Sequence, residues 1–157
     1  MRLKPTKTKI LSLRRLLPLR RRWARRGLRV VFTNGVFDIV HPGHVHILES
    51  ARALGDILIV GVNTDSSARR LGKGPSRPVN TLAERSSVLA AMAFVDAVVA
   101  FGEDTPEELV AELKPAVLVK GGDYRVHQVA GRTHAGRVVI IPFKKGYSTT
   151  ELLRKLG

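Results

Sequence analysis

Residues 33–44 read TNGVFDIVHPGH, and this stretch decides the fold of the chain. It follows a short β-branched run at residues 29–33 and precedes a segment of helical character at residues 43–54. A buried strand, a polar loop and a helix in this order begin a βαβ unit, which places the next strand parallel to the first. The stretch therefore predicts an α/β protein with a parallel sheet.

Short strands and helices alternate through the rest of the chain. Residues 56–62 form a nearly continuous apolar run, which is typical of a strand buried on both faces. Further elements are expected as strands at residues 97–101, 116–119 and 137–141, and as helices at residues 81–94, 105–113 and 148–156. This alternation predicts a Rossmann-like, doubly wound parallel sheet of about five strands with flanking helices.

Two of these helices carry more detailed expectations. In residues 81–94 the apolar side chains that recur on one side are Leu82, Val88, Leu89 and Met92. In residues 105–113 we expect Thr105 to cap the helix and Pro106 to take its first position.

The charge is concentrated in an N-terminal arm, residues 1–27. The chain has 157 residues and a net charge of +14, and the arm holds eleven of the 27 Lys and Arg and none of the 13 Asp and Glu. Residues 28–157 therefore form a nearly balanced single domain with 16 bases and 13 acids. In the arm we expect a basic amphipathic helix over residues 12–26, capped by Ser12, weakened by Pro18 and ended by Gly27.

The arm allows three interpretations. It can be a docking helix whose leucines and Trp23 pack on the body or on a second subunit, with its bases in water. It can be a non-enzymatic nucleic-acid-binding module, although it has one aromatic residue and no known binding signature. It can also be an organelle transit peptide, although it has few serines. We favour the docking helix and expect no nucleic acid as partner.

Composition excludes several classes of protein. The chain has no cysteine, which excludes disulfides, thiolate zinc sites and cysteine nucleophiles and fits a reducing compartment. No apolar run approaches the roughly 18 residues of a membrane span, and Arg14 and Arg15 interrupt the one candidate signal sequence. We therefore expect a cytoplasmic protein without membrane contact.

The segments that follow the strands carry most of the polar chemistry. Ligands of open parallel sheets bind beyond the carboxyl ends of the strands. The segments to inspect are therefore residues 34–44, 63–65, 101–104, 120–124 and 143–150.

In the first segment, His41 and His44 flank Gly43 at the expected start of a helix. Free backbone N–H groups and the helix dipole favour an anion there, and glycine allows it to approach closely. Two imidazoles can then stabilise a phosphoryl group that gains charge in a transition state. A zinc site formed by His41, His44 and His46 is the weaker alternative, because no carboxylate lies at ligand spacing.

Residues 28–156 resemble the HxGH nucleotidyltransferases of the cytidylyltransferase-like superfamily. Within them, the chain is most similar to the D-glycero-β-D-manno-heptose 1-phosphate adenylyltransferase domain of ADP-heptose synthase. The stretches that carry the resemblance are TNGVFDIVHPGH (33–44), DILIVGVNTD (56–65), RPVNTLAER (77–85), VKGGDY (119–124) and GYSTT (146–150).

The resemblance implies a role for each matching residue. His41, His44 and Lys120 would be catalytic. Nucleotide contacts would come from Thr33, Asn34, Gly35, Phe37, Gly43, Gly121, Gly122, Asp123, Ser148, Thr149 and Thr150. Ser148–Thr150 would hold the β- and γ-phosphates, although hydroxyls at a helix start can also be simple caps.

The remaining implied roles concern the acceptor. Arg77 and Arg85 would bind phosphates, for which a guanidinium fork is suited. Asp38 and Asp65 would face the acceptor sugar or a phosphate-bound Mg²⁺, although an aspartate in such a loop can also be a turn former. We expect the phosphates, rather than protein ligands, to hold most of the Mg²⁺ coordination.

The function expected from the resemblance is transfer of AMP from ATP to a heptose 1-phosphate, which gives ADP-heptose and pyrophosphate. A CTP-dependent transfer to glycerol 3-phosphate is the alternative with the same chemistry. Whether the product would enter lipopolysaccharide or another glycan stays open, as does a homodimer. Two features depart from the heptose branch. The segment 125–136 is short, with His127 and His134 in no known role, and we expect the kinase that often precedes this domain on a separate chain.

Overall fold

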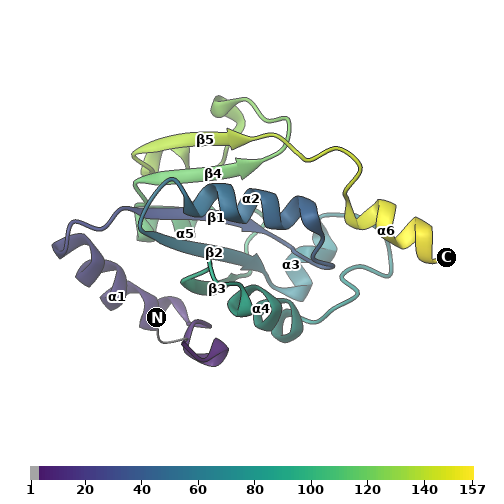
Figure 1. Cartoon of the computed structure of the whole chain (residues 1–157), viewed down its shortest axis with the longest axis horizontal. Coiled ribbons are helices and arrows are strands. Elements are labelled where there is room, and N and C mark those ends of the chain that lie inside the picture. Colours follow the sequence, from purple (N-terminus) through teal and green to yellow (C-terminus); the bar gives the residue numbers. More distant parts are fainter. Residues whose placement is uncertain (1–3) are drawn as a thin grey trace.

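The computed structural model describes residues 4–157, and its centre is a five-stranded, wholly parallel sheet (Figure 1). The strand order is β3-β2-β1-β4-β5. The strands are β1 (Val30–Gly35), β2 (Ile57–Asn63), β3 (Ala97–Phe101), β4 (Val117–Gly121) and β5 (Arg137–Ile141). The predicted fold class is therefore confirmed.

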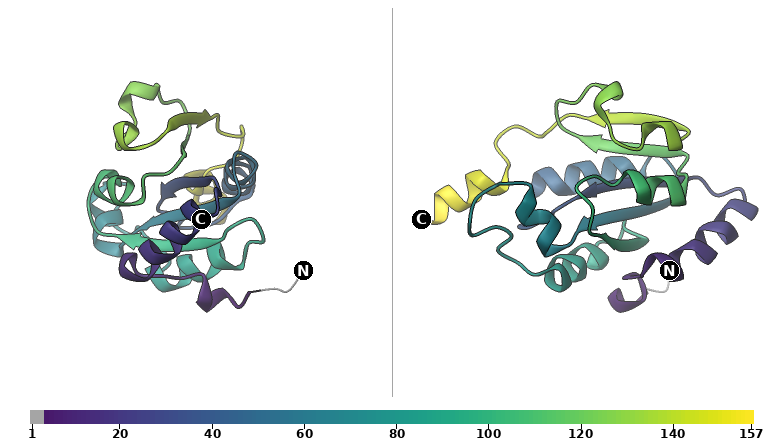
Figure 2. Two further views of the ribbon diagram at one scale, coloured as in Figure 1. Left: turned by 90° about the vertical axis from the view of Figure 1, so that its left-hand side faces the viewer. Right: turned by 180° about the vertical axis from the view of Figure 1, so that it is seen from behind.

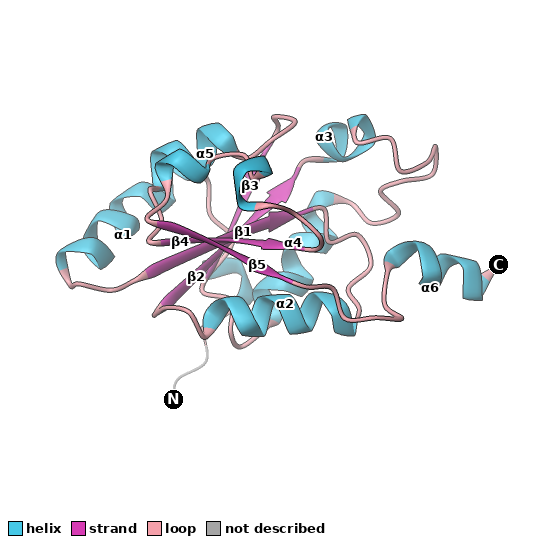
Figure 3. Ribbon diagram, turned by 90° about the horizontal axis from the view of Figure 1, so that it is seen from above, coloured by secondary structure: helices cyan, strands magenta, loops and turns pink. Residues whose placement is uncertain are grey.

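Helices cover both faces of the sheet, as expected for strands that are apolar on both sides (Figure 3). One face packs against α2 (Pro42–Arg52) and α4 (Leu82–Ala91), which contribute Leu48 and Leu89 to a continuous core. The other face packs against α1 (Leu13–Arg25) and α5 (Glu107–Leu113), which contribute Leu16 and Val110. The helices α3 (Asp65–Arg70) and α6 (Thr149–Leu156) and three short 3-10 turns, η1 (Thr6–Thr8), η2 (Val126–Gln128) and η3 (Arg132–His134), complete the chain.

The arm packs on the body, as the docking interpretation predicts. Ser12 caps α1 by accepting a hydrogen bond from the backbone N–H of Arg15. Leu16 is fully buried in the core, and α1 continues through Pro18 although proline removes one backbone hydrogen bond. Before the helix, Ile10 pairs in parallel with Val98 of the edge strand β3. The arm is thus part of the packed structure, and α1 lies at the opposite end of the molecule from α6 (Figures 1 and 2).

Two local predictions are wrong. Helix α5 begins at Glu107, with Pro106 as its N-cap residue and no side-chain cap, so Thr105 lies outside the helix. Helix α4 ends at Ala91, before the predicted residue 94, and Val88 is 49% exposed because it turns away from the core. The start of α4 is instead fixed by a capping box between Thr81 and Glu84.

The order of the strands reverses between β1 and β4, which are neighbours in the sheet but not in sequence. In such folds the crevice outside the carboxyl ends of these two strands is the usual ligand site. The TNGVFDIVHPGH stretch begins in the last residues of β1 and the KGGDY stretch in the last residues of β4, and both continue beyond the carboxyl ends of these strands. No helix in residues 4–157 is both long and apolar enough to cross a bilayer.

Candidate active site

A cleft of about 750 Å³ opens at the carboxyl ends of β1 and β4. Its wall includes the loop after β1, the start of α2, the end of β4 and the segment 143–151, which leads into α6. Stretches more than a hundred residues apart in sequence therefore meet in one cavity. In particular, the two imidazoles and the hydroxyls at the start of α6 line the same space.

The backbone fixes the position and the tautomer of His41. This residue is the N-cap of α2, and its Nδ1 accepts a hydrogen bond of 3.1 Å from the backbone N–H of Gly43. Because Nδ1 accepts, a neutral ring carries its proton on Nε2, which remains as a donor. A Cβ at Gly43 would lie 2.8 Å from the His41 ring, so glycine is needed for this arrangement.

His44 stacks on His41 with their ring centroids 3.8 Å apart. On its other side, Phe37 packs at 5.2 Å and holds a left-handed backbone conformation, with φ of 51°. Nδ1 of His44 is the one buried side-chain nitrogen or oxygen without a hydrogen-bond partner in the described part of the chain. Such an atom retains capacity to bond a ligand.

Burial favours the neutral form of both imidazoles. It lowers the pKa of His41, and burial together with the nearby His41 and Lys73 lowers the pKa of His44 to about 4. At neutral pH both rings are therefore uncharged, and each carries one N–H, which in His41 lies on Nε2.

The remaining charge in the cleft is strongly positive. The basic residues that line it are Lys73, Arg77, Lys120, Lys144 and Lys145. The two acids in the lining are both paired, Asp38 with Arg77 and Glu151 with Arg154. Burial and the charge of Lys73 lower the pKa of Lys120, whose Nζ lies 4.9 Å from the centre of the Tyr124 ring. An anion with several charges, such as a triphosphate, fits this excess.

The start of α6 is attached to the histidine loop. Ser148 caps the helix by accepting from the backbone N–H of Glu151 at 3.0 Å, and Thr149 donates to the carbonyl of Ile39 at 3.4 Å. Thr150 lines the cleft beside them. The three hydroxyl residues and the two histidines therefore line the same cleft, as the sequence predicts.

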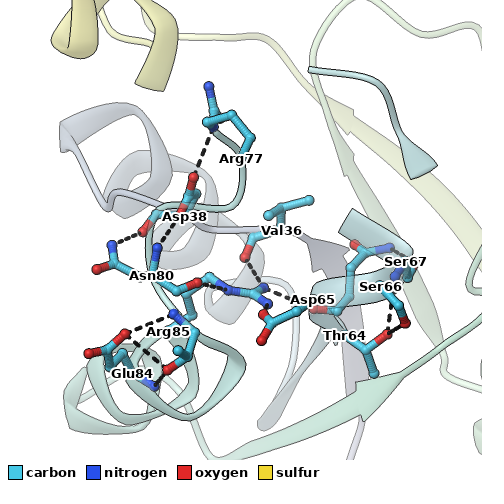
Figure 4. A network of polar contacts seen from close by, with 12 residues as sticks. Val36, Asp38, Thr64, Asp65, Ser66, Ser67, Arg77, Asn80, Glu84 and Arg85 are labelled. Carbon is cyan, nitrogen blue, oxygen red and sulfur yellow. Dashed lines mark hydrogen bonds and ion pairs between the residues drawn. The ribbon is translucent and has the colours of Figure 1, made fainter. Parts of the chain in front are cut away.

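Asp38 anchors the loop between α3 and α4 (Figure 4), which differs from the turn-forming interpretation because its carboxylate bonds residues about forty positions away instead of its own turn. Its carboxylate accepts from the backbone N–H groups of Val79 and Asn80, both at 2.9 Å, and from Nε of Arg77 at 2.8 Å. Burial alone would raise the pKa of Asp38, but these hydrogen bonds outweigh it and lower that pKa. Asp38 therefore holds Arg77 at the rim of the cleft and has little capacity left for substrate.

Arg85 requires a correction, because its side chain is fully buried and absent from the cleft wall. Its guanidinium donates to the carbonyls of Asn80, Val36 and Asn63 and pairs with Asp65 at 2.6 Å (Figure 4). With its guanidinium buried and bonded inside the protein, Arg85 cannot bind a phosphate directly, and Asp65, its partner, does not line the cleft either. Both residues instead join the loop after β1, the end of β2 and the start of α4, so they position the cleft.

The structure also divides the KGGDY stretch. Lys120, Gly121 and Tyr124 line the cleft, whereas Gly122 and Asp123 do not. Gly122 has a φ of 113° and lies under the Phe143 ring, 2.7 Å from where a Cβ would be, and Asp123 is exposed. Thr33, Asn34, Gly35, Phe37 and Gly43 all lie in the wall, as expected of nucleotide contacts.

The sequence motifs missed three side chains of the cleft, Phe143, Lys144 and Lys145, and Tyr147 lies within the GYSTT motif but was given no role. Their signal was position alone, since they lie in the segment that follows β5. No three His, Cys, Asp or Glu side chains gather as metal ligands within residues 4–157. The triad of His41, His44 and His46 therefore does not form the alternative zinc site, and His46 is exposed on α2.

Comparison with known proteins agrees with this geometry. A family model described as cytidylyltransferase-like matches residues 32–155. The protein named bifunctional protein HldE is 56% identical over 139 residues in Gluconacetobacter diazotrophicus and 53% identical over 135 residues in Histophilus somni. These matches cover 86% and 83% of this chain, which spans only 28% of the length of either relative.

Two solved structures share the fold. The lipopolysaccharide core biosynthesis protein from Thermoplasma volcanium has a TM-score of 0.63 and 31% sequence identity, over 78% of this chain and 100% of that one. The pantoate-beta-alanine ligase from Francisella tularensis has a TM-score of 0.61 and 15% identity, over 87% of this chain and 67% of that one, and therefore supports the fold alone.

Proposed function

The chain belongs to the cytidylyltransferase-like family of nucleotidyltransferases, and from this premise we propose that it transfers AMP from ATP to a heptose 1-phosphate. The products are ADP-heptose and pyrophosphate. The observation that supports this most is the single cleft in which neutral His41 and His44, Lys120 and the start of α6 converge.

The reaction is an in-line displacement at the α-phosphorus of ATP. A phosphate oxygen of the acceptor forms a bond to this phosphorus, while the bond to the oxygen that bridges to the β-phosphorus breaks and pyrophosphate leaves. The protein contributes positioning and charge stabilisation rather than covalent chemistry. In this proposal the N–H groups of His41 and His44 donate to the α-phosphate, which gains charge in the transition state.

The other side chains of the cleft divide the remaining phosphates between them. Ser148, Thr149 and Thr150, at the positive end of the α6 dipole, hold the β- and γ-phosphates. Lys120, at the end of β4, contacts the same groups, while Arg77 and Lys73, from the loop between α3 and α4, bind the acceptor phosphate. Mg²⁺ would be held mainly by phosphate oxygens, because the carboxylate of Asp38, the aspartate in the cleft wall, already accepts three hydrogen bonds.

Two features support ATP and heptose over other substrates. The relatives of more than half identity are named HldE, and the Thermoplasma structure is named for lipopolysaccharide core biosynthesis. Transfer of CMP from CTP to glycerol 3-phosphate uses the same histidines and remains the second candidate. A kinase activity would act before this transfer, and the relatives' name, bifunctional, is compatible with such a second activity.

The test is a pyrophosphate-release assay with Mg²⁺, in which ATP and CTP are each combined with heptose 1-phosphate and glycerol 3-phosphate. We expect release above background with ATP and heptose 1-phosphate only. His44→Ala should reduce kcat roughly 10²–10³-fold, because it removes a donor to the developing charge. Exposed His127→Ala is the matched control and should keep full activity. Release with CTP and glycerol 3-phosphate would select the second candidate, and equal rates for wild type and His44→Ala would refute the role of the histidines.

A further inference from the structure

The most strongly charged surface of the molecule lies on α1, away from the cleft. Six arginines form what we call the arginine face: Arg14, Arg15, Arg21, Arg22, Arg25 and Arg26. All six are exposed, and none makes an ion pair or side-chain hydrogen bond within the described residues. At 3.6 residues per turn they cover an arc of roughly 140° on the side of the helix opposite Leu16.

The orientation of this face is fixed by packing. Leu16 is fully buried beneath the helix, and Leu13, Leu17, Leu19 and Trp23 pack around the same core. Arg20, which lies outside the arc on the same side of the helix as Leu16, donates to the carbonyls of Leu113 and Lys114 at the end of α5, both at 2.8 Å. One arginine therefore helps to attach the helix, while the other six are held outward although neighbouring like charges on a helix repel.

The family model does not extend over the face, because its match begins at residue 32. The relative from Gluconacetobacter diazotrophicus aligns with 86% of this chain, so its alignment reaches only the C-terminal part of α1. The helix also lies at the end of the molecule opposite α6 and the cleft, so its charge does not line the nucleotide site (Figures 1 and 2). A self-repelling row of arginines that is firmly docked and outside the family model indicates a separate anionic partner.

We propose that the arginine face binds the surface of an anionic lipid bilayer by charge, without insertion. Four to eight basic side chains on an amphipathic helix are typical of binding to anionic lipids, and guanidinium groups pair with phosphate bidentately. Insertion is excluded because the apolar side of α1 is already buried in the protein core.

The composition of the face favours a bilayer over a nucleic acid. Between Arg14 and Arg26 the arc contains, besides arginine, only Pro18. It has no amide or hydroxyl side chain to contact base edges and no aromatic ring on which a base could stack. Its six charges spread over about 18 Å of helix, which suits a plane of phosphate groups.

The test is sedimentation of the full-length protein with vesicles of equal parts phosphatidylcholine and phosphatidylglycerol, and with vesicles of phosphatidylcholine alone. We expect binding to the anionic vesicles at low ionic strength and its loss at about 1 M salt, where the screening length is about 3 Å. Replacing Arg14, Arg21 and Arg25 together by Gln should weaken the partition coefficient roughly 100-fold. Helix content and nucleotidyl transfer should not change, because these side chains touch neither the core nor the cleft.

A matched triple variant separates the face from overall charge. Replacing the exposed Arg69, Arg132 and Lys155 by Gln removes the same three charges elsewhere, and we expect it to bind nearly as well as wild type. Equal loss in both triple variants would overturn the proposal, as would equal binding to neutral vesicles. Tighter binding to duplex DNA than to the anionic vesicles at the same salt would overturn it in favour of a nucleic acid.

Discussion

The cleft and the arginine face are both basic, but they hold their charges differently. The bases of the cleft converge from three separate segments around neutral imidazoles and helix-terminal hydroxyls, and two of them, Arg77 and Lys120, are partly buried. The bases of the face come from one helix, are exposed and have no polar neighbours of other kinds. Convergence and partial burial suit a small ligand with several phosphates, whereas a one-sided row suits an extended anionic surface.

The largest effect should come from an arginine that belongs to neither surface. Arg85→Ala removes the buried guanidinium and leaves three carbonyls and Asp65 without their partner. We expect the free energy of unfolding to fall by about 3–5 kcal/mol, measured by urea denaturation. Arg69→Ala, on exposed surface, is the control and should change it by less than about 0.5 kcal/mol. If the Arg85→Ala protein were stable but failed to bind ATP, the result would indicate that Arg85 does contact a phosphate directly.

The second largest effect on stability should come from Leu16, the buried side chain beneath the arginine face. Leu16→Ala should cost about 3 kcal/mol of unfolding free energy, because it leaves a cavity beneath α1. Leu156→Ala, at an 81% exposed position on α6, should cost almost nothing. Since α1 does not line the cleft, the folded Leu16→Ala protein should keep its KM for ATP. A large change in KM would show that the two regions are coupled.

The histidines of the cleft should make stability depend on pH. The pKa of His44 is lowered from 6.5 to about 4, so the unfolded chain takes up a proton between these values that the folded protein resists. Stability is therefore retained above pH 6.5 and lost as pH falls, by roughly 2 kcal/mol at about pH 4.5. Denaturation curves should show that His44→Gln lacks this part of the decline and that His127→Gln retains it. An unchanged decline in His44→Gln would assign it to other groups.

The smallest expected effect is on the KM for ATP, and it allows a direct comparison of the cleft with the arginine face. Replacing Lys144 and Lys145 together by Gln should raise the KM for ATP about 10-fold with little change in kcat, because these charges attract the phosphates in ground state and transition state alike. Replacing Arg21 and Arg25 by Gln removes the same charge from the arginine face and should leave KM unchanged. Steady-state kinetics at fixed ionic strength distinguish the two, and equal effects would mean that net charge alone attracts ATP.

The sequence predicts the sheet and the main elements of the cleft because these depend on local patterns. The apolar run 56–62, the cap at Ser12 and the glycine between two histidines each have a short-range physical meaning. Strand order then brings the segments together, since the carboxyl ends of parallel strands share an edge. For that reason His41, Lys120 and Ser148 could be assigned to one site before any coordinates existed.

What the sequence could not decide depends on long-range packing. Arg77 and Arg85 look equivalent in sequence, yet one reaches the cleft and the other is buried under it, because Asp38 and Asp65 select different partners. Lys144 and Lys145 lie in the segment 143–150 that the sequence marks for inspection, but only the course of the chain after β5 shows that both line the cleft. Thr105 has the chemistry of a cap, but α5 starts at Glu107, after Pro106, and leaves it outside.

The pairing of Ile10 with β3 has a practical consequence for work on this protein. Backbone hydrogen bonds of 2.9 and 2.8 Å join Leu11 to Val98 and Val98 to Lys9, so the arm occupies the free edge of the sheet. Deletion of residues 1–27 would expose that edge together with the apolar bed of Leu16, and unpaired edge strands recruit other chains into aggregates. Insolubility of such a truncated protein would report this exposure rather than a lost binding function, so point substitutions are the safer tool.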